Sequence, residues 1–528
     1  MNDPSKEDSV TAIDSRDANA GLRWGVYCLL IALAAGISVG RILAVNSVDN
    51  VRLEKYLIDQ ESSRKRADLR EDGVEGEELE RALEEHMERY RAQRRQQRPF
   101  LSSNDRSRWA TVRSLVEHGT YQIDEIVKQP TWDSIDVVKH DRFGRQAHEA
   151  DVGHIYSSKP PLYATLLAAE YWVIHRVTGY DLGSHPYEIG RFMLITVNVI
   201  PLVIYFCLLA RVVEGYGTTD WGRIFVMAAA TLGTLLLTFV IVINNHLPAA
   251  VSVMIALYAL LRIWHDGRRQ WWYFFLAGLF AAFAAANELP ALSFLALVGA
   301  ALLWKAPRET ILAFLPGVAI VAAGFFGANW IAHHSLRPPY AHRSEGDDWY
   351  SFQYYRNDAE RERGRVRESY WSSKEYQSTI DRGEASRGKY ALHVLIGHHG
   401  IFSLTPVWLL TVVGLGMAVA RPQTNLRYLA VGVIFLSLVC IAFYLLRPEG
   451  DRNYGGSTSG FRWMFWFAPL WLVTMLPAAD AASRSRWLRI LSAVLLGLSA
   501  LSVAYPTWNP WTHPWLMNFM GYMEWVEM

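Results

Sequence analysis

The stretch GHIYSSKPPLYATLLAAEYW, residues 153–172, decides how the chain is laid out across a membrane. Its second half opens an apolar segment, 161–178, whose length approaches that of a membrane span. That segment also carries Glu170, and Lys159 stands directly before the two prolines that open it. If 161–178 crosses the membrane, every later loop changes side. The topology of the whole chain therefore depends on this one segment.

Long apolar runs dominate the rest of the chain. The 528 residues are 51% hydrophobic and include 21 Trp. Runs near 20 apolar residues can cross a hydrocarbon core of about 30 Å. Spans are expected at 24–45, 190–212, 222–243, 246–265, 271–287, 290–305, 309–332, 399–420, 427–446, 461–479 and 487–505. The sequence therefore predicts an all-α polytopic membrane protein with about 11 transmembrane helices, the first an uncleaved anchor.

Basic residues indicate which loops face the cytoplasm. With a cytoplasmic N-terminal tail (1–23) and 161–178 outside the membrane core, the short inside loops are rich in Lys and Arg. These residues are Arg211, Arg223, Arg268, Arg269, Lys305, Arg308, Arg421, Arg427, Arg484, Arg486 and Arg489. If 161–178 spans the membrane, all of them move outside. We therefore expect 161–178 to lie half buried in the outer interface and the tail 506–528 to lie outside.

Two polar segments then face outward, 46–188 and 333–398. A transmembrane core at 190–332 separates them, and the C-terminal spans occupy 399–505. Within the first segment, residues 51–98 are dense in Glu and Arg at spacings of three and four, which suits a solvated helix. A partner-binding coiled coil is the less favoured interpretation, because the a/d apolar repeat is poor. We expect 51–98 to be a charged helical insertion.

A second helix is expected at 104–118. Trp109, Val112 and Val116 fall on one face, and Gly119 ends the pattern. Asn104 and Asp105 stand at its start, where short polar side chains cap free N–H groups. Spacing alone therefore favours a capping role for Asp105. Together with 161–178, this helix is expected to lie at the outer interface.

Further polar residues arrive at the outer ends of the expected spans. They are Asn244, Asn245 and His246 in one stretch, Glu288 in another and Arg462 in a third. Each alone is explained by a local role, as a hydrogen-bonded histidine, a paired carboxylate or a headgroup anchor. A transport path would place polar groups near mid-membrane. Their convergence on one face instead suits a reaction at the membrane surface.

Composition excludes some classes of protein. The net charge of +1 carries no signal for nucleic-acid binding. Cys28, Cys207 and Cys440 all lie in apolar runs, with no Cys/His spacing that would hold zinc. The sequence therefore supports no disulfide framework and no metal site.

Three features together point to a family. NDRSRWATVRSLVEHGTY (104–121) is similar to a pattern of an acidic residue, then an Arg and an aromatic, here Arg108 and Trp109, then a helix ending at Gly. YSSKPPLY (156–163) is similar to a Tyr-x-x-Lys-Pro motif before a short interfacial helix. One span, a long outer loop and then many spans complete the likeness, over about 24–332. In these features the chain resembles the GT-C membrane glycosyltransferases, in the branch of protein O-mannosyltransferases and lipid A aminoarabinose transferases.

The resemblance implies a GT-C-like bundle that transfers a sugar from a polyprenyl-phosphate carrier to a hydroxyl acceptor. The acceptor is a lipid, glycan or protein on the outer face of the cytoplasmic (inner) membrane. Asp105 matches the catalytic acidic position, where a carboxylate serves as general base. Lys159 matches the lysine near the carrier's phosphate, where a fixed cation stabilises the leaving group. Tyr156 matches its neighbouring tyrosine.

Other candidate site residues come from the first motif and from the polar groups that converge on the outer face. Arg462 is a second candidate for binding the donor phosphate, and Arg108, Asn245, His246 and Glu288 are further candidates. The chain departs from the family at His246 in NHLP, where a second acidic residue is common. A divalent metal is therefore possible in principle but is not supported by this sequence.

The residues leave two alternative functions open. An O-antigen ligase or polymerase is also multi-span, but its large loop lies later in the chain, whereas the longest loop here follows the first span. A transporter or flippase would show broken helices with polar groups at mid-membrane and an inverted repeat. A cleft that opens sideways to lipid at the outer face favours the transferase.

Overall fold

The computed structural model describes residues 4–47, 50–93, 100–129, 131–344, 346–356, 358–421 and 426–526, and the chain is mostly helical. The helices up to the middle of the chain are α1 (Pro4–Ser47), α2 (Asn50–Glu71), α3 (Gly76–Gln93), α4 (Ser103–Glu117), α5 (Asp124–Val127), α6 (Pro161–Thr178), α7 (Pro186–Leu194), α8 (Ile200–Tyr216), α9 (Asp220–Leu232), α10 (His246–Trp264) and α11 (Trp271–Asn287). The later helices are α12 (Leu292–Lys305), α13 (Pro307–Glu309), α14 (Leu315–His333), α15 (Asp358–Glu362), α16 (Arg387–Leu395), α17 (Ile401–Leu404), α18 (Trp408–Ala420), α19 (Arg427–Leu445), α20 (Ala468–Ala482), α21 (Arg486–Ala504) and α22 (Trp515–Tyr522). Three two-stranded sheets pair β1 (Val137–His140) with β2 (His154–Ser157), β3 (Arg343–Ser344) with β4 (Asp347–Asp348), and β5 (Gln353–Tyr354) with β6 (Arg367–Glu368).

Eight helical segments in the described part of the chain are long and apolar enough to cross a membrane. They are Asn19–Ala44, Pro186–Tyr216, Asp220–Ile241, His246–Trp264, Pro307–His333, Arg427–Leu445, Arg462–Ala482 and Arg486–Ala504. Three more of the expected spans coincide with shorter apolar helices, Trp271–Asn287, Leu289–Lys305 and Trp408–Ala420. The chain is therefore a helical polytopic membrane protein, and the count of eleven spans stays a prediction.

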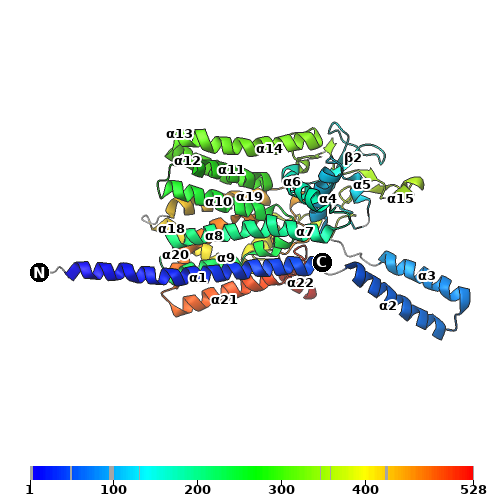
Figure 1. Cartoon of the computed structure of the whole chain (residues 1–528), viewed down its shortest axis with the longest axis horizontal. Coiled ribbons are helices and arrows are strands. Elements are labelled where there is room, and N and C mark those ends of the chain that lie inside the picture. The colour runs from blue at the N-terminus through cyan, green and yellow to red at the C-terminus, as the bar shows by residue number, and fades with distance from the viewer. Residues whose placement is uncertain are drawn as a thin grey trace.

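The long helices run side by side in one bundle (Figure 1). Helices α4, α5 and α6 and strand β2 gather at one end of it, and α13 lies at the opposite end. In the expected topology α13 belongs to a cytoplasmic loop and α4 to the first outer segment. The bundle thus separates the two groups of loops by its full length.

Helix α4 is buried on all sides over Asn104–Ser114, although its sequence pattern predicts one solvent-facing side. Its polar residues are hydrogen-bonded inside the protein, which is what makes their burial tolerable. Ser102 is the N-cap and accepts a hydrogen bond from the backbone N–H of Asp105 at 3.1 Å. The expectation that Asp105 or Asn104 caps this helix is therefore wrong. The carboxylate of Asp105 is free for another partner.

Helix α6 covers the segment 161–178 and is not among the helices that are apolar enough to span. Pro161 occupies its first turn, where a missing N–H costs nothing, and Gly179 ends it in the left-handed conformation. One side packs on α4 and α14. The other side exposes apolar side chains that include Leu166, Trp172 and Val177. An exposed apolar stripe on an amphipathic helix suits a membrane interface, so this placement of α6 stays a proposal.

A short antiparallel hairpin, β1–β2, interrupts the helical pattern of the first outer segment, and helix-based analysis of the sequence missed it. Its register pairs Val137 with Ser157 and Val138 with Tyr156. Continued by one residue, this register brings Asp136 opposite Ser158, whose N–H donates to the Asp136 carbonyl at 3.1 Å. The hairpin therefore joins two segments that are 22 residues apart at the entrance to α6.

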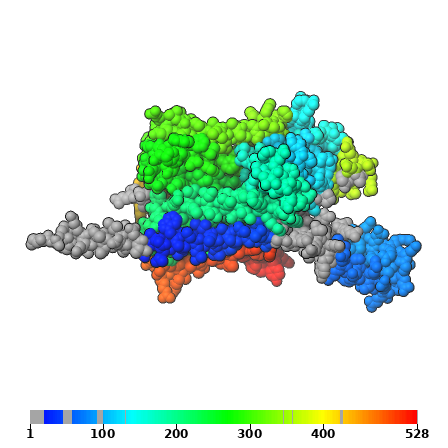
Figure 2. Space-filling view, viewed as in Figure 1, coloured from blue at the N-terminus to red at the C-terminus, as the bar shows by residue number. Residues whose placement is uncertain are grey.

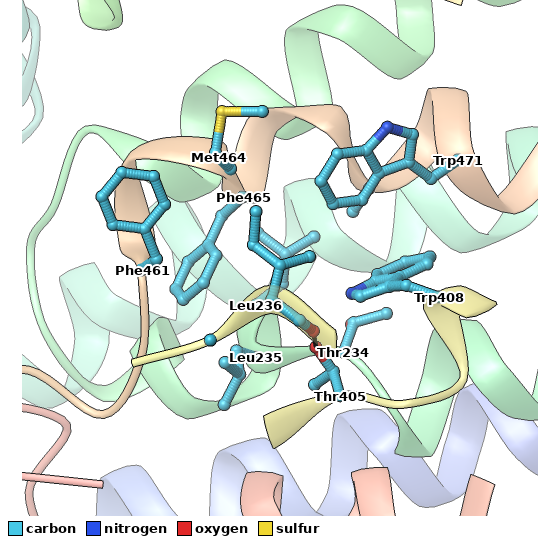
Figure 3. Close-up of a pocket in the computed structure, with 12 residues that line it drawn as sticks. Thr234, Leu235, Leu236, Thr405, Trp408, Phe461, Met464, Phe465 and Trp471 are labelled. Carbon is cyan, nitrogen blue, oxygen red and sulfur yellow. Dashed lines mark hydrogen bonds between the residues drawn. The ribbon is translucent and has the colours of Figure 1, made fainter. Parts of the chain in front are cut away.

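A 3-10 turn, Arg462–Phe467, leads into α20 and is anchored by its apolar side chains. Phe461, Met464 and Phe465 point into a small pocket of about 30 Å³ together with Trp408 and Trp471 (Figure 3). A volume of this size holds about two water molecules, so the side chains around it pack closely. The turn is thereby held in place and presents Arg462 to a different cavity.

Helices α2 and α3 lie in the segment 51–98 and pack against each other. Leu79, Leu83 and Met87 are buried in this contact, and His86 pairs with Glu61 at 3.0 Å. In the space-filling view the described part of this pair forms a lobe beside the bundle (Figure 2).

Candidate active site

A cavity of about 500 Å³ lies at the end of the bundle that carries α4 and α6. It is built from α4, the segment before β1, the segment after β2, the start of α10, the α11–α12 junction, the 453–457 loop and the turn that begins at Arg462. Of the predicted site residues, the cavity lining includes Arg108, Lys159, Asn245, His246, Glu288 and Arg462. Asp105 and Tyr156 are not among the lining residues.

A chain of hydrogen bonds connects the floor of this cavity. Arg108 donates to the side-chain oxygen of Asn245 at 2.8 Å and also bonds Asn104 within its own helix. The Asn245 amide donates to Glu288 Oε1 at 2.6 Å. Helix α4 is far in sequence from α10 and α11, so this chain of hydrogen bonds ties it to them at the polar end of the bundle.

His246 links this chain to Arg462. Arg462 Nη1 lies 2.7 Å from His246 Nε2 and, as a permanent donor, requires that nitrogen to accept. The ring proton must then sit on Nδ1, which bonds Glu288 Oε1. Arg462 also donates twice to the Gly455 carbonyl, at 3.0 and 2.9 Å. Together these contacts hold the Arg462 guanidinium at the wall of the cavity, beside the 453–457 loop.

Lys159 forms an ion pair with Asp136, whose Oδ1 lies 2.7 Å from Nζ. Both residues line the cavity. Burial lowers the pKa of Lys159 to about 8, because the charged form is poorly solvated. Burial alone would raise the pKa of Asp136, but Lys159, Arg462 and Arg108 together hold it below its ordinary value. The pair is therefore charged near neutral pH.

Asp105 lies beneath the cavity and is 2% exposed. Its Oδ1 accepts the backbone N–H of Ile243 at 2.9 Å, which joins α4 to the extended stretch before α10. Burial raises the pKa of Asp105 to about 7, against the opposing effect of the Ile243 N–H and of Arg108. This carboxylate thus holds the α4 N-terminus next to Asn244 and Asn245.

Tyr156 lies in the β1–β2 hairpin rather than in the cavity lining. Its ring stacks on His140, with centroids 4.1 Å apart, and it packs in a cluster with Val138 and Trp349. Burial raises the pKa of Tyr156 to about 12. It lines a much smaller neighbouring pocket that also contacts Lys159 and Arg108.

The cavity is slightly positive overall. Its charged lining residues are Arg108, Lys159, Arg343, Arg447 and Arg462 against Asp136, Glu288, Asp381 and Asp451. Five cations against four carboxylates leave a formal charge of +1. Sequence reasoning missed Asp136, Arg343, Asp381, Arg447 and Asp451 because each lies in a segment without a motif. For Arg343 and Asp381 the local signal was the density of aromatic and charged residues in 333–398.

Part of the cavity lining is apolar and exposed. Leu289 and Phe443 both line it and are 43% and 44% exposed. Phe443 belongs to a candidate membrane helix, and Leu289 begins the apolar stretch of α12. Exposed apolar side chains at the ends of membrane helices suit contact with lipid. The cavity therefore joins a charged floor to an apolar mouth.

The residues present do not fit a divalent metal at the position where the resemblance implies one. The Nε2 lone pair of His246 is taken by Arg462, and Nδ1 carries the proton bonded to Glu288. A metal ligand needs a free nitrogen lone pair. Within the described ranges, no group of three or more His, Cys, Asp or Glu side chains could hold a metal ion.

Comparison with known proteins yields few likenesses. No family model matches the chain, and no curated protein matches it. Among solved structures it is similar to the Archaeoglobus fulgidus oligosaccharyltransferase in its apo form, with 14% identity and a TM-score of 0.37 over 78% of this chain and 52% of that one. It is also similar to oligosaccharyltransferase AglB of that organism in complex with an inhibitory peptide and a dolichol-phosphate, with 13% identity and a TM-score of 0.35 over 78% and 51%.

This chain spans about half the length of those two proteins. At such identities and TM-scores neither their fold nor their activity transfers to it. The proposed function rests instead on the cavity and on the motifs of the sequence.

Proposed function

We propose that this protein is an integral-membrane glycosyltransferase of the GT-C type. It moves a sugar from a polyprenyl-phosphate carrier to a hydroxyl acceptor on the extracytoplasmic face of the cytoplasmic (inner) membrane. The acceptor is a lipid, glycan or protein hydroxyl. One observation carries the proposal, namely that a single cavity at the end of the bundle combines a cationic polar floor with an apolar mouth. A lipid phosphate has the matching pair of features, an anionic head and an apolar chain.

The charges of the cavity support an anionic donor. The cavity lining carries five cations against four carboxylates. In the proposed complex the phosphate contacts Lys159 and Arg462, and the isoprenoid chain leaves past Leu289 and Phe443. As the sugar–phosphate bond breaks, negative charge grows on the phosphate. Fixed cations in a site with little water stabilise that charge.

The proposed reaction also needs a base for the acceptor hydroxyl, and a carboxylate suits this task. Asp105 is the candidate from sequence, and its role stays a proposal. Its position beneath the cavity means that it reaches a hydroxyl only if the α4 N-terminus moves away from Ile243. The carboxylates that do line the cavity are Asp136, Glu288, Asp381 and Asp451.

Binding of undecaprenyl phosphate tests the proposal. The full chain in lipid nanodiscs is titrated with this lipid, and bound copies are counted by native mass spectrometry. We expect saturable binding that Lys159→Met weakens by about 10²-fold or more, the usual effect of removing one well-placed electrostatic partner. Lys374→Met, the same change at an exposed lysine of the second outer segment, is the matched control.

Lipid analysis of a deletion strain supplies the second test. Without the transferase, the donor is made but not consumed, so a polyprenyl-phosphate sugar should accumulate and its mass identifies the sugar. The wild-type gene returned to the strain should clear it. Absence of both the lipid binding and the accumulation would refute the proposal.

A further inference from the structure

Asp136 is a carboxylate of the cavity that no motif of the sequence singles out. It stands directly before β1, and the hairpin register brings it opposite Ser158. Lys159 follows Ser158 and reaches Asp136 Oδ1 at 2.7 Å. The side chain of Ser158 also lies 3.5 Å from the same oxygen. The other carboxylate oxygen of Asp136 makes no such contact with Lys159 or Ser158. Asp136 also lines the cavity.

Asp136 satisfies a geometric requirement that Asp105 does not. A general base must come within hydrogen-bond reach of the proton that it removes. Asp105 is absent from the cavity lining, and its Oδ1 is occupied by the Ile243 N–H. Glu288, another carboxylate of the lining, already binds both Asn245 and His246 through Oε1. Of the other lining carboxylates, Asp451 is held by Arg343 and Arg447, and Asp381 accepts hydrogen bonds from Tyr370 and Ser378. Asp136 is the lining carboxylate that is paired with Lys159.

That partner is also the group expected to bind the donor phosphate. An ammonium has three donors on a flexible stem, so Lys159 can turn from a carboxylate to a phosphate without leaving the cavity. A phosphate that attracts Lys159 weakens the pair with Asp136. The carboxylate, no longer held by its counter-ion, then becomes the stronger proton acceptor. Arrival of the donor and activation of the base are thereby coupled.

We propose that Asp136 is the general base of the transfer and that Lys159 moves from Asp136 to the donor phosphate when the donor binds. This inference rests on the proposed function. The acceptor O–H bond breaks and its proton goes to the Asp136 carboxylate, while the acceptor oxygen forms a bond to the anomeric carbon. The bond from that carbon to the phosphate oxygen breaks, and its electron pair stays on the phosphate beside Lys159. Asp105 is then a positioning residue that holds α4 against Ile243.

The test separates binding from turnover in Asp136→Asn. The variant removes a negative charge from the anion site and releases Lys159, so undecaprenyl phosphate should bind to it in nanodiscs at least as tightly as to wild type. Turnover is measured as clearance of the accumulated donor lipid when the variant gene is returned to the deletion strain. We expect clearance to fall by about 10²-fold or more, as for loss of a general base. Asp68→Asn, on an exposed face of α2, is the matched control.

Each other outcome is informative. Clearance within a few fold of wild type, or loss of lipid binding in Asp136→Asn, overturns the inference and makes Asp136 a support for Lys159. If Asp136→Asn does not reach the membrane, Asp136→Glu replaces it. That change keeps the ion pair and the lipid binding but misplaces the base by one methylene, so clearance should still fall. Failure of the wild-type protein to bind the lipid, with no accumulation in the deletion strain, defeats the proposed function itself.

Discussion

At the scale of single residues, the Lys159–Asp136 pair decides how the cavity responds to an anion. A buried ion pair contributes little net stability, because desolvation of both charges offsets their attraction. Retaining such a pair inside a cavity is therefore better explained by function. The pair leaves Lys159 charged below a pKa of about 8 and neutral above it. Its charge is thus sensitive to pH just above the neutral range.

Lipid binding should depend on pH in the same way as the charge of Lys159. The ammonium form of Lys159 attracts phosphate and the neutral amine does not, so affinity for undecaprenyl phosphate should fall as pH rises through about 8. The limiting slope for one proton is about tenfold per pH unit. Titrations between pH 7.5 and 10 avoid the second ionisation of the phosphate near pH 6. Lys159→Arg keeps its charge throughout this range, so a fall of equal size in that variant would contradict the assignment.

Arg462 leads to a second prediction at this scale. Because Arg462 and Glu288 occupy both nitrogens of His246, no lone pair of that ring is left for a metal. Binding of undecaprenyl phosphate should therefore be unchanged by EDTA and by later addition of Mg²⁺, Mn²⁺ or Zn²⁺. A chelator-induced loss of binding that one of these ions restores would show that the His246–Arg462 contact opens to admit a metal.

At the scale of elements, the β1–β2 hairpin is the part that assembles the anion site. Its turn region depends on Gly153, which has φ +79 and lies against His140 and Ala147. A Cβ at this position would come within 2.7 Å of the His140 carbonyl oxygen and 2.6 Å of the Ala147 Cβ. No side chain fits there without movement of the strand. The pairing of Asp136 with Lys159 therefore relies on a glycine at the turn end of the hairpin.

Gly153→Ala should consequently weaken lipid binding without changing any charge of the site. We expect a lower melting temperature and a loss of affinity for undecaprenyl phosphate, both measured in nanodiscs. Gly364→Ala is the matched control, because Gly364 has φ +62 but an added Cβ would meet nothing within 4 Å. It bears the same backbone strain without the clash. Equal affinity in the two variants would mean that the hairpin does not position Lys159.

At the scale of the whole molecule, the bundle places α4, α6 and β2 at one end and α13 at the other (Figure 1). The arrangement agrees with the distribution of basic loops only if α6 does not cross the membrane. Single cysteines at Arg142 and Ser184, on either side of α6, should both react with a membrane-impermeant maleimide from outside. A cysteine at Arg268 should react only after the membrane is opened. The background is a variant without Cys28, Cys207 and Cys440. Opposite reactivity at Arg142 and Ser184 would make α6 a span.

The sequence by itself determined the class of protein and most of the residues that gather in the cavity. Apolar runs predicted the helices, because a chain in lipid must satisfy its backbone hydrogen bonds within each segment. Polar residues at the ends of those runs, such as Asn245, Glu288 and Arg462, were recognisable because polar and charged side chains are rare within membrane spans. These signals are local, so they can be read from the sequence without knowledge of the tertiary structure.

Only the tertiary structure decided which carboxylate faces the cavity. Asp105 belongs to a sequence motif, yet helix packing places it beneath the cavity, where its carboxylate accepts a hydrogen bond from the Ile243 N–H. Asp136 carries no motif, yet the hairpin register sets it against Lys159 across 22 intervening residues. The tautomer of His246 likewise follows from Arg462, which lies 216 positions later. Register and long-range packing depend on all elements at once, so no local pattern of residues encodes them.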